Sequence, residues 1–170
     1  MEAIGSAARK LHPRPFGGLA MPDGNEGPTI AARLAAGEFV SDAELESCLP
    51  AWVQELSTVH WTPVKVATRA AAFLAGGLGE RARLLDVGSG AGKFCVVAAA
   101  ATGARCIGVD VNARLVEVAR QLAAKLDVRS AKFRHSPMER IRWRPFNGIY
   151  FYNPFAEQFI DDGLRERGVE

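Results

Sequence analysis

The stretch Leu84–Ala99, LLDVGSGAGKFCVVAA, decides the fold of this 170-residue chain. A short apolar run around Asp86 ends abruptly at Gly88, and an apolar helical pattern begins directly after Gly92. This order predicts a strand, a tight turn and a helix N-terminus. Glycine permits positive φ and a close approach of a ligand, and a helix N-terminus offers free N–H groups to an anion. We therefore expect the turn to bind a ligand.

The spacing of the glycines indicates which ligand. A dinucleotide fingerprint, G-x-G-x-x-G, requires glycine at position 93, where this chain has Lys93, so an NAD-dependent oxidoreductase is disfavoured. The pattern here is D-x-G-x-G-x-G, from Asp86 to Gly92. It resembles the first motif of the class I S-adenosylmethionine-dependent methyltransferases, and the resemblance covers about residues 60–155. It implies S-adenosylmethionine as cofactor, bound by Asp86, Gly88, Ser89, Gly90 and Gly92.

Composition predicts one domain with a buried core. The chain is 48% hydrophobic and carries a net charge of +2, so no overall basic field points to nucleic acid. The three cysteines lack C-x-x-C spacing, and no apolar run reaches the ~20 residues of a membrane helix. We expect reduced thiols, a cytoplasmic location and no contact with a membrane. The three histidines have no partner at ligand spacing, so we expect no metal.

The N-terminal third is predicted to be less regular than the rest. Prolines and glycines without periodicity predict an irregular arm over residues 1–38, ahead of a domain spanning 39–170. Ser41 and Glu44 form a capping box for a helix that Pro50 interrupts or restarts. Thr62 and Pro63 predict the N-cap and first position of the next helix. By the resemblance, this segment reaches over the methionine end of the cofactor, which makes Thr62 a binding candidate.

The chain after the glycine turn alternates helix and strand. Helices are expected over 93–102 and 113–126, and strands over 105–109, 132–135 and 148–155. This alternation predicts an α/β three-layer, Rossmann-like domain with a mainly parallel sheet in the order 3-2-1-4. Asp110 closes the second strand, where a nucleotide-binding unit places a carboxylate that accepts both ribose hydroxyls. By the resemblance, Ser136 and Met138, after the third strand, contact the adenine.

The fourth strand ends in Asn153, Pro154 and Phe155. In the order 3-2-1-4 its end borders the crevice beside the first strand, where ligands bind. The segment resembles the fourth motif of methylases that act on amino groups, and it is also similar to non-SET histone-lysine methyltransferases. Carbonyl oxygens at Asn153 and Pro154 can accept from an amino group and direct its lone pair to the methyl group, while Phe155 packs on the substrate. These three residues are the catalytic candidates, with Asn153 also facing the cofactor.

Several alternatives stay open at this stage. The expected acceptor is a protein side-chain nitrogen or another amine, but six basic residues between Arg129 and Arg144 could instead steer a nucleic acid. About three strands that follow the fourth in complete members of the class are missing. We expect a truncated or reduced domain, and two chains could associate through the fourth-strand edge. A cofactor-binding module that needs a partner chain for transfer is the competing function.

Overall fold

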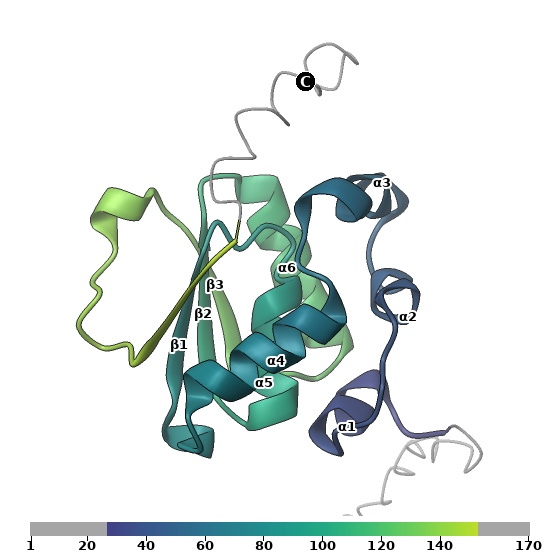
Figure 1. Ribbon diagram of the computed structural model, residues 1–170. Coiled ribbons are helices and arrows are strands. Elements are labelled where there is room, and N and C mark those ends of the chain that lie inside the picture. The colour runs from purple at the N-terminus through teal and green to yellow at the C-terminus, as the bar shows by residue number, and fades with distance from the viewer. Residues whose placement is uncertain (1–26, 153–170) are drawn as a thin grey trace, which may run out of the picture.

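The computed structural model describes residues 27–152, with the backbone alone for residues 57–60. Its central element is a four-stranded parallel sheet in the order β3-β2-β1-β4, as the sequence predicts (Figure 1). The strands are β1 Arg83–Val87, β2 Arg105–Asp110, β3 Ala131–His135 and β4 Gly148–Phe151. The α-helices are α1 Ile30–Ala35, α2 Asp42–Glu46, α3 Ala51–His60, α4 Val64–Ala75, α5 Lys93–Thr102 and α6 Ala113–Lys125, and the short 3-10 helices are η1 Gly79–Arg81 and η2 Met138–Arg140.

Helices α4, α5 and α6 cover one face of the sheet, and α1 to α3 lie outside them (Figure 1). Helix α5 is buried almost all round because it packs between the sheet, α4 and α1. Strand residues Leu84, Cys106 and Phe133 face this helical layer and belong to the main core. The apolar stripes of the three helices therefore hold the sheet from one side.

The opposite face of the sheet, which we call the second face, carries a thinner layer. Leu85, Val87 and Val109 form a small separate core there. Ile141 and Phe146 pack against it from the segment joining β3 to β4, residues 136–147, which contains η2. Backbone hydrogen bonds fix both ends of this segment, from Ser136 N to the Asp110 carbonyl and from Asn147 N to the Arg83 carbonyl. The third layer of the domain is thus this segment.

The N-terminal region is more ordered than the sequence predicts. An irregular arm was expected over residues 1–38, but Thr29 caps helix α1, whose Leu34 is buried in the main core. The amphipathic pattern of a six-residue helix is too short to stand out from its surroundings. Residues 1–26 lie outside the described part of the chain, and the domain boundary at residue 39 stays a prediction.

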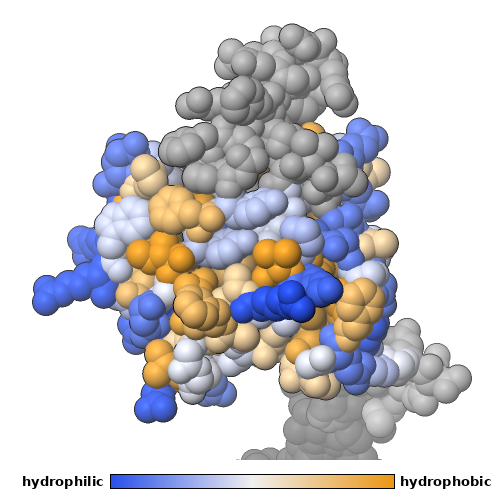
Figure 2. Space-filling view, viewed as in Figure 1, coloured by the Kyte–Doolittle hydropathy of each residue, from blue (hydrophilic) through white to orange (hydrophobic). Residues whose placement is uncertain are grey.

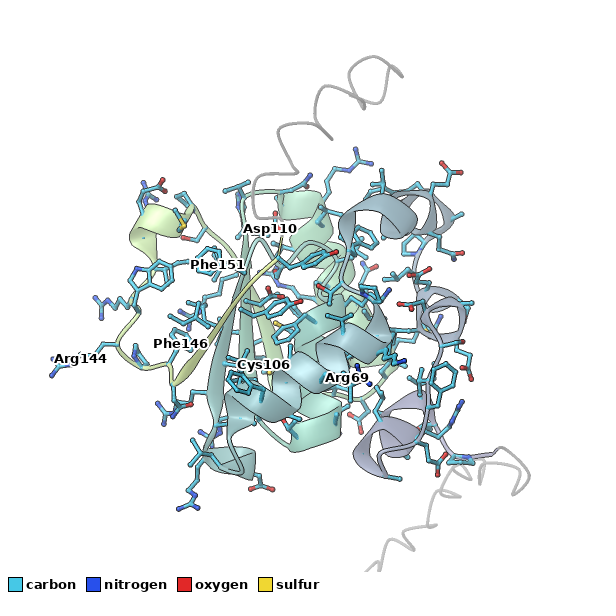
Figure 3. The ribbon with its side chains drawn as sticks, in the orientation of Figure 1. Arg69, Cys106, Asp110, Arg144, Phe146 and Phe151 are labelled. Carbon is cyan, nitrogen blue, oxygen red and sulfur yellow. The ribbon has the colours of Figure 1, made fainter. Side chains whose placement is uncertain are left out.

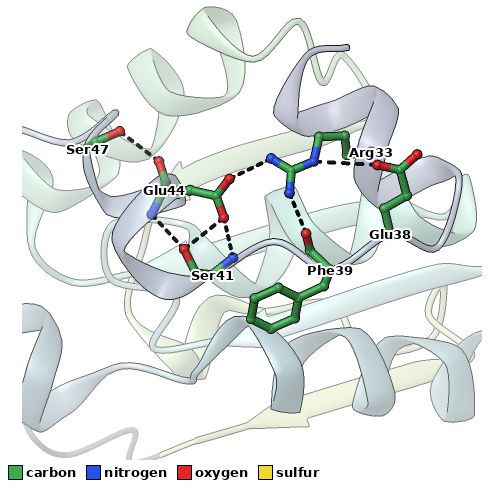
Figure 4. A network of polar contacts seen from close by, with 6 residues as sticks. All are labelled: Arg33, Glu38, Phe39, Ser41, Glu44 and Ser47. Atoms are coloured by element: carbon green, nitrogen blue, oxygen red, sulfur yellow. Dashed lines mark hydrogen bonds and ion pairs between the residues drawn. The ribbon is translucent and has the colours of Figure 1, made fainter. Parts of the chain in front are cut away.

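Arg33 joins α1 to α2 through a network of charge-assisted bonds (Figure 4). Its guanidinium pairs with the Glu44 carboxylate at 2.5 Å and donates to the Phe39 carbonyl. Glu44 also accepts from the Ser41 backbone, which completes the predicted capping box. The Arg33 hydrogen bond, with those from Ser41, lowers the pKa of Glu44 to about 2. The network fixes the turn between the two short helices.

The predicted N-cap of α4 is wrong by one position. Pro63 is the N-cap residue and, because it lacks a polar side chain, makes no side-chain bond to the helix. Instead Val64 N donates to Asp42 Oδ1 of α2 at 2.9 Å. Sequence patterns predict only caps supplied by neighbouring residues, whereas Asp42 lies 22 residues before Val64. Thr62 is free for another contact.

A substitution at Gly92, the N-cap of α5, tests how tightly the helical layer is packed. Its φ is +83°, and an added Cβ would lie 2.6 Å from the Phe133 ring and 2.7 Å from the Ala119 methyl. We expect Gly92→Ala to lower the free energy of unfolding by about 3 kcal/mol, from backbone strain together with overpacking. Urea denaturation followed by circular dichroism measures this.

Gly37→Ala is the matched control, because Gly37 has φ +74° with no atom within 4 Å of the added Cβ. It should cost about 1 kcal/mol, the strain alone. Equal losses in the two variants would contradict the packing role of Gly92.

Candidate active site

The glycine loop lies at the carboxyl edge of the sheet, between β1 and α5. Gly88, Gly90 and Gly92 all have positive φ, at 75°, 51° and 83°. The Gly88 and Ser89 amides donate to the Val109 carbonyl, so the loop is anchored on β2. The packing of Gly92 against Phe133 and Ala119 shows that this third glycine serves the approach of helix and sheet. Its assignment to the cofactor stays a prediction.

Asp110 holds the loop from the end of the neighbouring strand. Its Oδ2 accepts from Gly90 N at 2.6 Å and its Oδ1 accepts from Asn112 N at 2.7 Å. The side chain is 2% exposed, and Figure 3 shows it at the carboxyl edge of the sheet. Each carboxylate oxygen has a further lone pair, so Asp110 can accept additional donors without releasing the loop. The predicted ribose contact is compatible with these two bonds and stays a prediction.

Asp86, the acidic residue of the glycine motif, is buried at the end of β1 with 4% of its surface exposed. Its Oδ2 accepts a weak bond from the Cys95 thiol at 3.7 Å. Burial raises the pKa of Asp86 to about 7, and the nearby charge of Asp110 adds to the rise. A cation placed beside Asp86 would stabilise its ionised form and lower this raised pKa.

A cavity of about 20 Å³ lies beside Asp86, which is room for a single water molecule. Ser89 Oγ is the one buried side-chain polar atom without a partner among the described residues, and it lines this cavity. Gly108 makes room for it, since a Cβ there would lie 2.7 Å from Ser89 Oγ. The cavity walls therefore contain an unsatisfied hydroxyl and a buried carboxyl, both suited to a polar ligand.

Aromatic side chains close the cavity on two sides. Trp61, between α3 and α4, lies over the loop, with its Nε1 3.1 Å from the position of an added Gly90 Cβ. Thr62 is 5% exposed and its Oγ1 is 2.9 Å from the Tyr150 hydroxyl of β4. Tyr150 stacks on Phe94 of α5 with ring centroids 3.8 Å apart. Thr62 thus lines the cavity, and its contact with the cofactor stays a prediction. Tyr150 was missed because a strand tyrosine has no distinctive sequence signal.

Lys93 is the second residue that sequence reasoning missed. It follows the last glycine, is 4% exposed, and pairs with Asp42 at 2.5 Å and Glu46 at 2.6 Å, both from α2. A buried ammonium at a helix N-terminus is unfavourable alone, so these two carboxylates stabilise it. The sequence shows only that Lys93 breaks the dinucleotide fingerprint. The structure shows that it ties the N-terminal helices to the glycine loop.

The remaining candidates are placed only in part. Ser136 follows β3, and its hydroxyl donates to the Pro137 carbonyl at 3.2 Å. Met138 in η2 is 36% exposed. Asn153, Pro154 and Phe155 lie outside the described residues, directly after the strand β4 that borders β1. The adenine and catalytic roles stay predictions.

Residues 27–152 contain no group of three or more histidine, cysteine, aspartate or glutamate side chains able to hold a metal ion. None of their helices has the length and apolarity needed to cross a membrane.

The comparisons with known proteins agree with this geometry. Residues 78–155 match the family model described as a methyltransferase domain. The fold is similar to that of an RNA methyltransferase from Salinibacter ruber, crystallised with S-adenosyl-L-homocysteine, at 27% identity and a TM-score of 0.51. That match covers 62% of this chain and 69% of the other. Residues 78–155 thus match a methyltransferase domain, and the fold is that of the class I S-adenosylmethionine-dependent methyltransferases.

Two other matched structures share less with this chain. One is a putative protein-L-isoaspartate O-methyltransferase from Plasmodium falciparum, at 18% identity and a TM-score of 0.43, covering 54% of this chain and 50% of that one. The other is the bifunctional kinase-methyltransferase WbdD, at 25% identity and a TM-score of 0.46, covering 61% of this chain and 24% of that one. No curated protein sequence matches this chain.

The raised pKa of Asp86 gives stability a pH dependence. Between pH 4 and pH 7 the folded protein keeps the Asp86 proton, whereas the unfolded chain has lost it above its ordinary pKa of 3.8. The free energy of unfolding should therefore fall with rising pH by up to about 1.4 kcal/mol per unit, and level off above about pH 7. Urea denaturation at a series of pH values measures the slope.

Asp86→Asn removes this titration and should flatten the curve between about pH 4 and pH 7, the range in which the folded and unfolded chains differ in protonation at this residue. An unchanged slope in this variant would show that another group titrates there.

The Lys93 ion pairs are predicted to stabilise the fold. Lys93→Met leaves the Asp42 and Glu46 carboxylates without their shared ammonium, and should lower the free energy of unfolding by about 2 kcal/mol. Arg129→Met is the control, since Arg129 pairs with Asp127 at 2.9 Å but is 87% exposed. It should change stability by less than about 0.5 kcal/mol. Thermal melts measure the stability of both variants, and similar losses of stability would refute a special role for Lys93.

Proposed function

We propose that this chain transfers a methyl group from S-adenosylmethionine to a nitrogen of a protein side chain or of another amine. The observation that supports it most is the glycine loop flanked by Asp86 and Asp110 at the ends of adjacent strands. The loop follows β1, which borders β4 at the point where the strand order reverses, and α/β sheets bind ligands beside such a point.

The residues present fit the cofactor on three grounds. The carboxyl groups of Asp86 and Asp110 suit a molecule with a protonated amino group and donor hydroxyls on its sugar. Ser89 Oγ supplies an unsatisfied buried polar group next to them. The aromatic rings of Trp61 and Tyr150 border the same cavity. When bound, the cofactor supplies an activated methyl group on a positively charged sulfur.

The chain's own residues then position the cofactor and the acceptor, and they exclude water. Asp110 keeps the loop in shape through its bond to Gly90. A bound cation would lower the raised pKa of Asp86, and the ionised carboxylate would then lie opposite that cation. Trp61 and Thr62 cover the loop and exclude water from it. The oxygens predicted at Asn153 and Pro154 accept from the acceptor amine, which keeps its lone pair directed at the methyl carbon. Positioning is the main demand, because the leaving sulfide is neutral.

RNA is the second candidate acceptor. The similar structure from Salinibacter ruber is described as an RNA methyltransferase. The six basic residues between Arg129 and Arg144 would suit contacts to phosphates. A cofactor-binding module that transfers methyl only with a partner chain remains the alternative to an independently active enzyme. We also propose the cytoplasm as its compartment, consistent with the free thiols of Cys48, Cys95 and Cys106.

Calorimetric titration with S-adenosylmethionine tests the cofactor site. We expect Asp110→Ala to weaken binding by about ten-fold or more, roughly 1.4 kcal/mol, through loss of a charged acceptor and of loop order. Asp127→Ala, at an exposed aspartate, should bind like the parent chain. Circular dichroism confirms that each variant is folded. Equal affinities for all three proteins would overturn the proposed site.

The acceptor is tested by transfer of a tritiated methyl group to a mixture of protein and RNA. The proposal predicts a label that protease releases and that survives mild base, because N-methyl bonds are stable where methyl esters hydrolyse. Release by ribonuclease would favour the RNA alternative. A base-labile label would contradict transfer to nitrogen.

A further inference from the structure

The Asp42 carboxylate, at the start of α2, joins two segments that border the candidate site. Its Oδ1 accepts at 2.9 Å from the backbone N–H of Val64, the first residue of α4, and pairs with Lys93 Nζ at 2.5 Å. Lys93 is the first residue of α5 and directly follows the last glycine of the loop. Asp42 is not among the residues that line the cavity beside Asp86. Its influence on that cavity therefore passes through the two segments that it joins.

The first of these segments, Trp61–Pro63, which we call the cover segment, lies over the glycine loop. Trp61 Nε1 is 3.1 Å from the position of an added Gly90 Cβ, so the indole lies against the loop backbone. Thr62 Oγ1 is 2.9 Å from the Tyr150 hydroxyl. Both Trp61 and Thr62 line the same cavity. The cover segment thus forms one wall of the candidate site.

The Asp42 bond fixes the end of the cover segment where α4 begins. The N–H of Val64 is one of the donors that a helix N-terminus leaves unpaired, and Pro63 has no side-chain acceptor for it. Val64 is 2% exposed, so water has little access to replace the carboxylate. A buried donor without a partner is unfavourable. Without Asp42, we expect the cover segment to shift until this N–H reaches water.

The position of the Asp42 carboxylate is itself fixed. Burial alone would raise the pKa of Asp42, but the bonds with Lys93 and Val64 outweigh it and lower the pKa. The carboxylate is therefore ionised at neutral pH. The capping box of Ser41 and Glu44, part of the network in Figure 4, holds the first turn of α2. The geometry of α2 thus reaches the cover segment through one carboxylate oxygen.

We propose that Asp42 is a positioning residue of the cofactor site, which holds the cover segment against the glycine loop and so sets how tightly the loop retains S-adenosylmethionine. This role rests on the proposed function, because it concerns the same site. A wall that is already in place in the free chain loses less conformational freedom when a ligand binds. Trp61 and Thr62 border the ligand, whereas Asp42 acts through them.

The first test measures, in the ligand-free chain, whether Asp42 holds Trp61. Trp52→Phe and Trp143→Phe, at two partly exposed positions, leave Trp61 as the one tryptophan of the chain. In this background we expect Asp42→Ala to raise acrylamide quenching of Trp61 fluorescence by at least about two-fold, because the indole moves away from the loop. Acrylamide is uncharged, so the strongly hydrophilic side chains at the margin of the molecule do not bias its access (Figure 2).

Asp42→Asn separates the hydrogen bonds from the charge. The amide oxygen of asparagine can still accept from Val64 N and Lys93 Nζ, so we expect quenching close to that of the parent chain. Asp42→Ala should remain folded, since Lys93 keeps Glu46 as a counter-ion at 2.6 Å. Thermal melts confirm that both variants are folded at the temperature of the measurement.

The second test measures affinity by calorimetric titration with S-adenosylhomocysteine. Asp42→Ala should bind at least about ten-fold more weakly than the parent chain, which is 1.4 kcal/mol, and Asp42→Asn less than about three-fold more weakly. Asn147→Ala is the matched control, because Asn147 Oδ1 also accepts a backbone N–H, that of Arg83, at the amino edge of the sheet. It should leave both quenching and affinity unchanged.

Several results would overturn the proposal. Unchanged quenching or unchanged affinity in Asp42→Ala would show that the cover segment does not depend on this carboxylate. Equal losses in Asp42→Ala and Asp42→Asn would assign the effect to charge and not to the bond with Val64. An equal loss of affinity in Asn147→Ala would reduce it to general stability. If the parent chain itself does not bind, the proposed function fails and the effect on affinity with it, whereas the quenching data still decide whether Asp42 holds the cover segment.

Discussion

The hydrogen bond from Gly90 N to the Asp110 carboxylate is the contact on which the site depends. At 2.6 Å and fully buried, it joins the loop after β1 to the end of β2. The three glycines of the loop have positive φ and are flexible in the unfolded chain. The bond to the Asp110 carboxylate helps to hold them in one conformation. The second oxygen of Asp110 fixes Asn112, the N-cap of α6. One side chain thus orders both crossovers that border the site.

The asymmetry of the sheet separates two kinds of surface. Helices α4 to α6 bury one face, and Trp61, Thr62 and Lys93 lie around the glycine loop. The other face is apolar at the centre and basic at the rim. The glycine loop and Asp110 lie at the carboxyl edge of the sheet, whereas Ser136, a predicted adenine contact, lines a cavity on the other face.

The sheet and its order could be predicted because local patterns carry them: apolar runs of strand length, the glycine turn, the apolar run of α5 and the amphipathic period of α6. The links from far along the chain could not. The Asp42 bond to Val64, the pairing of Lys93 with Asp42 and Glu46, and the contact of Thr62 with Tyr150 join segments 22 to 88 residues apart. Nothing in the local sequence signals them. Helix α1 was missed because six residues carry too little periodicity.

The most direct test of the central claim is a titration of the isotopically labelled chain with S-adenosylhomocysteine, followed by the amide resonances in NMR spectra. The account predicts saturable shifts concentrated at residues 86–92 and 110–112, around the Gly90–Asp110 bond. It would be contradicted by a folded chain whose loop resonances do not move at millimolar ligand, or whose shifts gather instead at Arg83 and Arg105 on the second face.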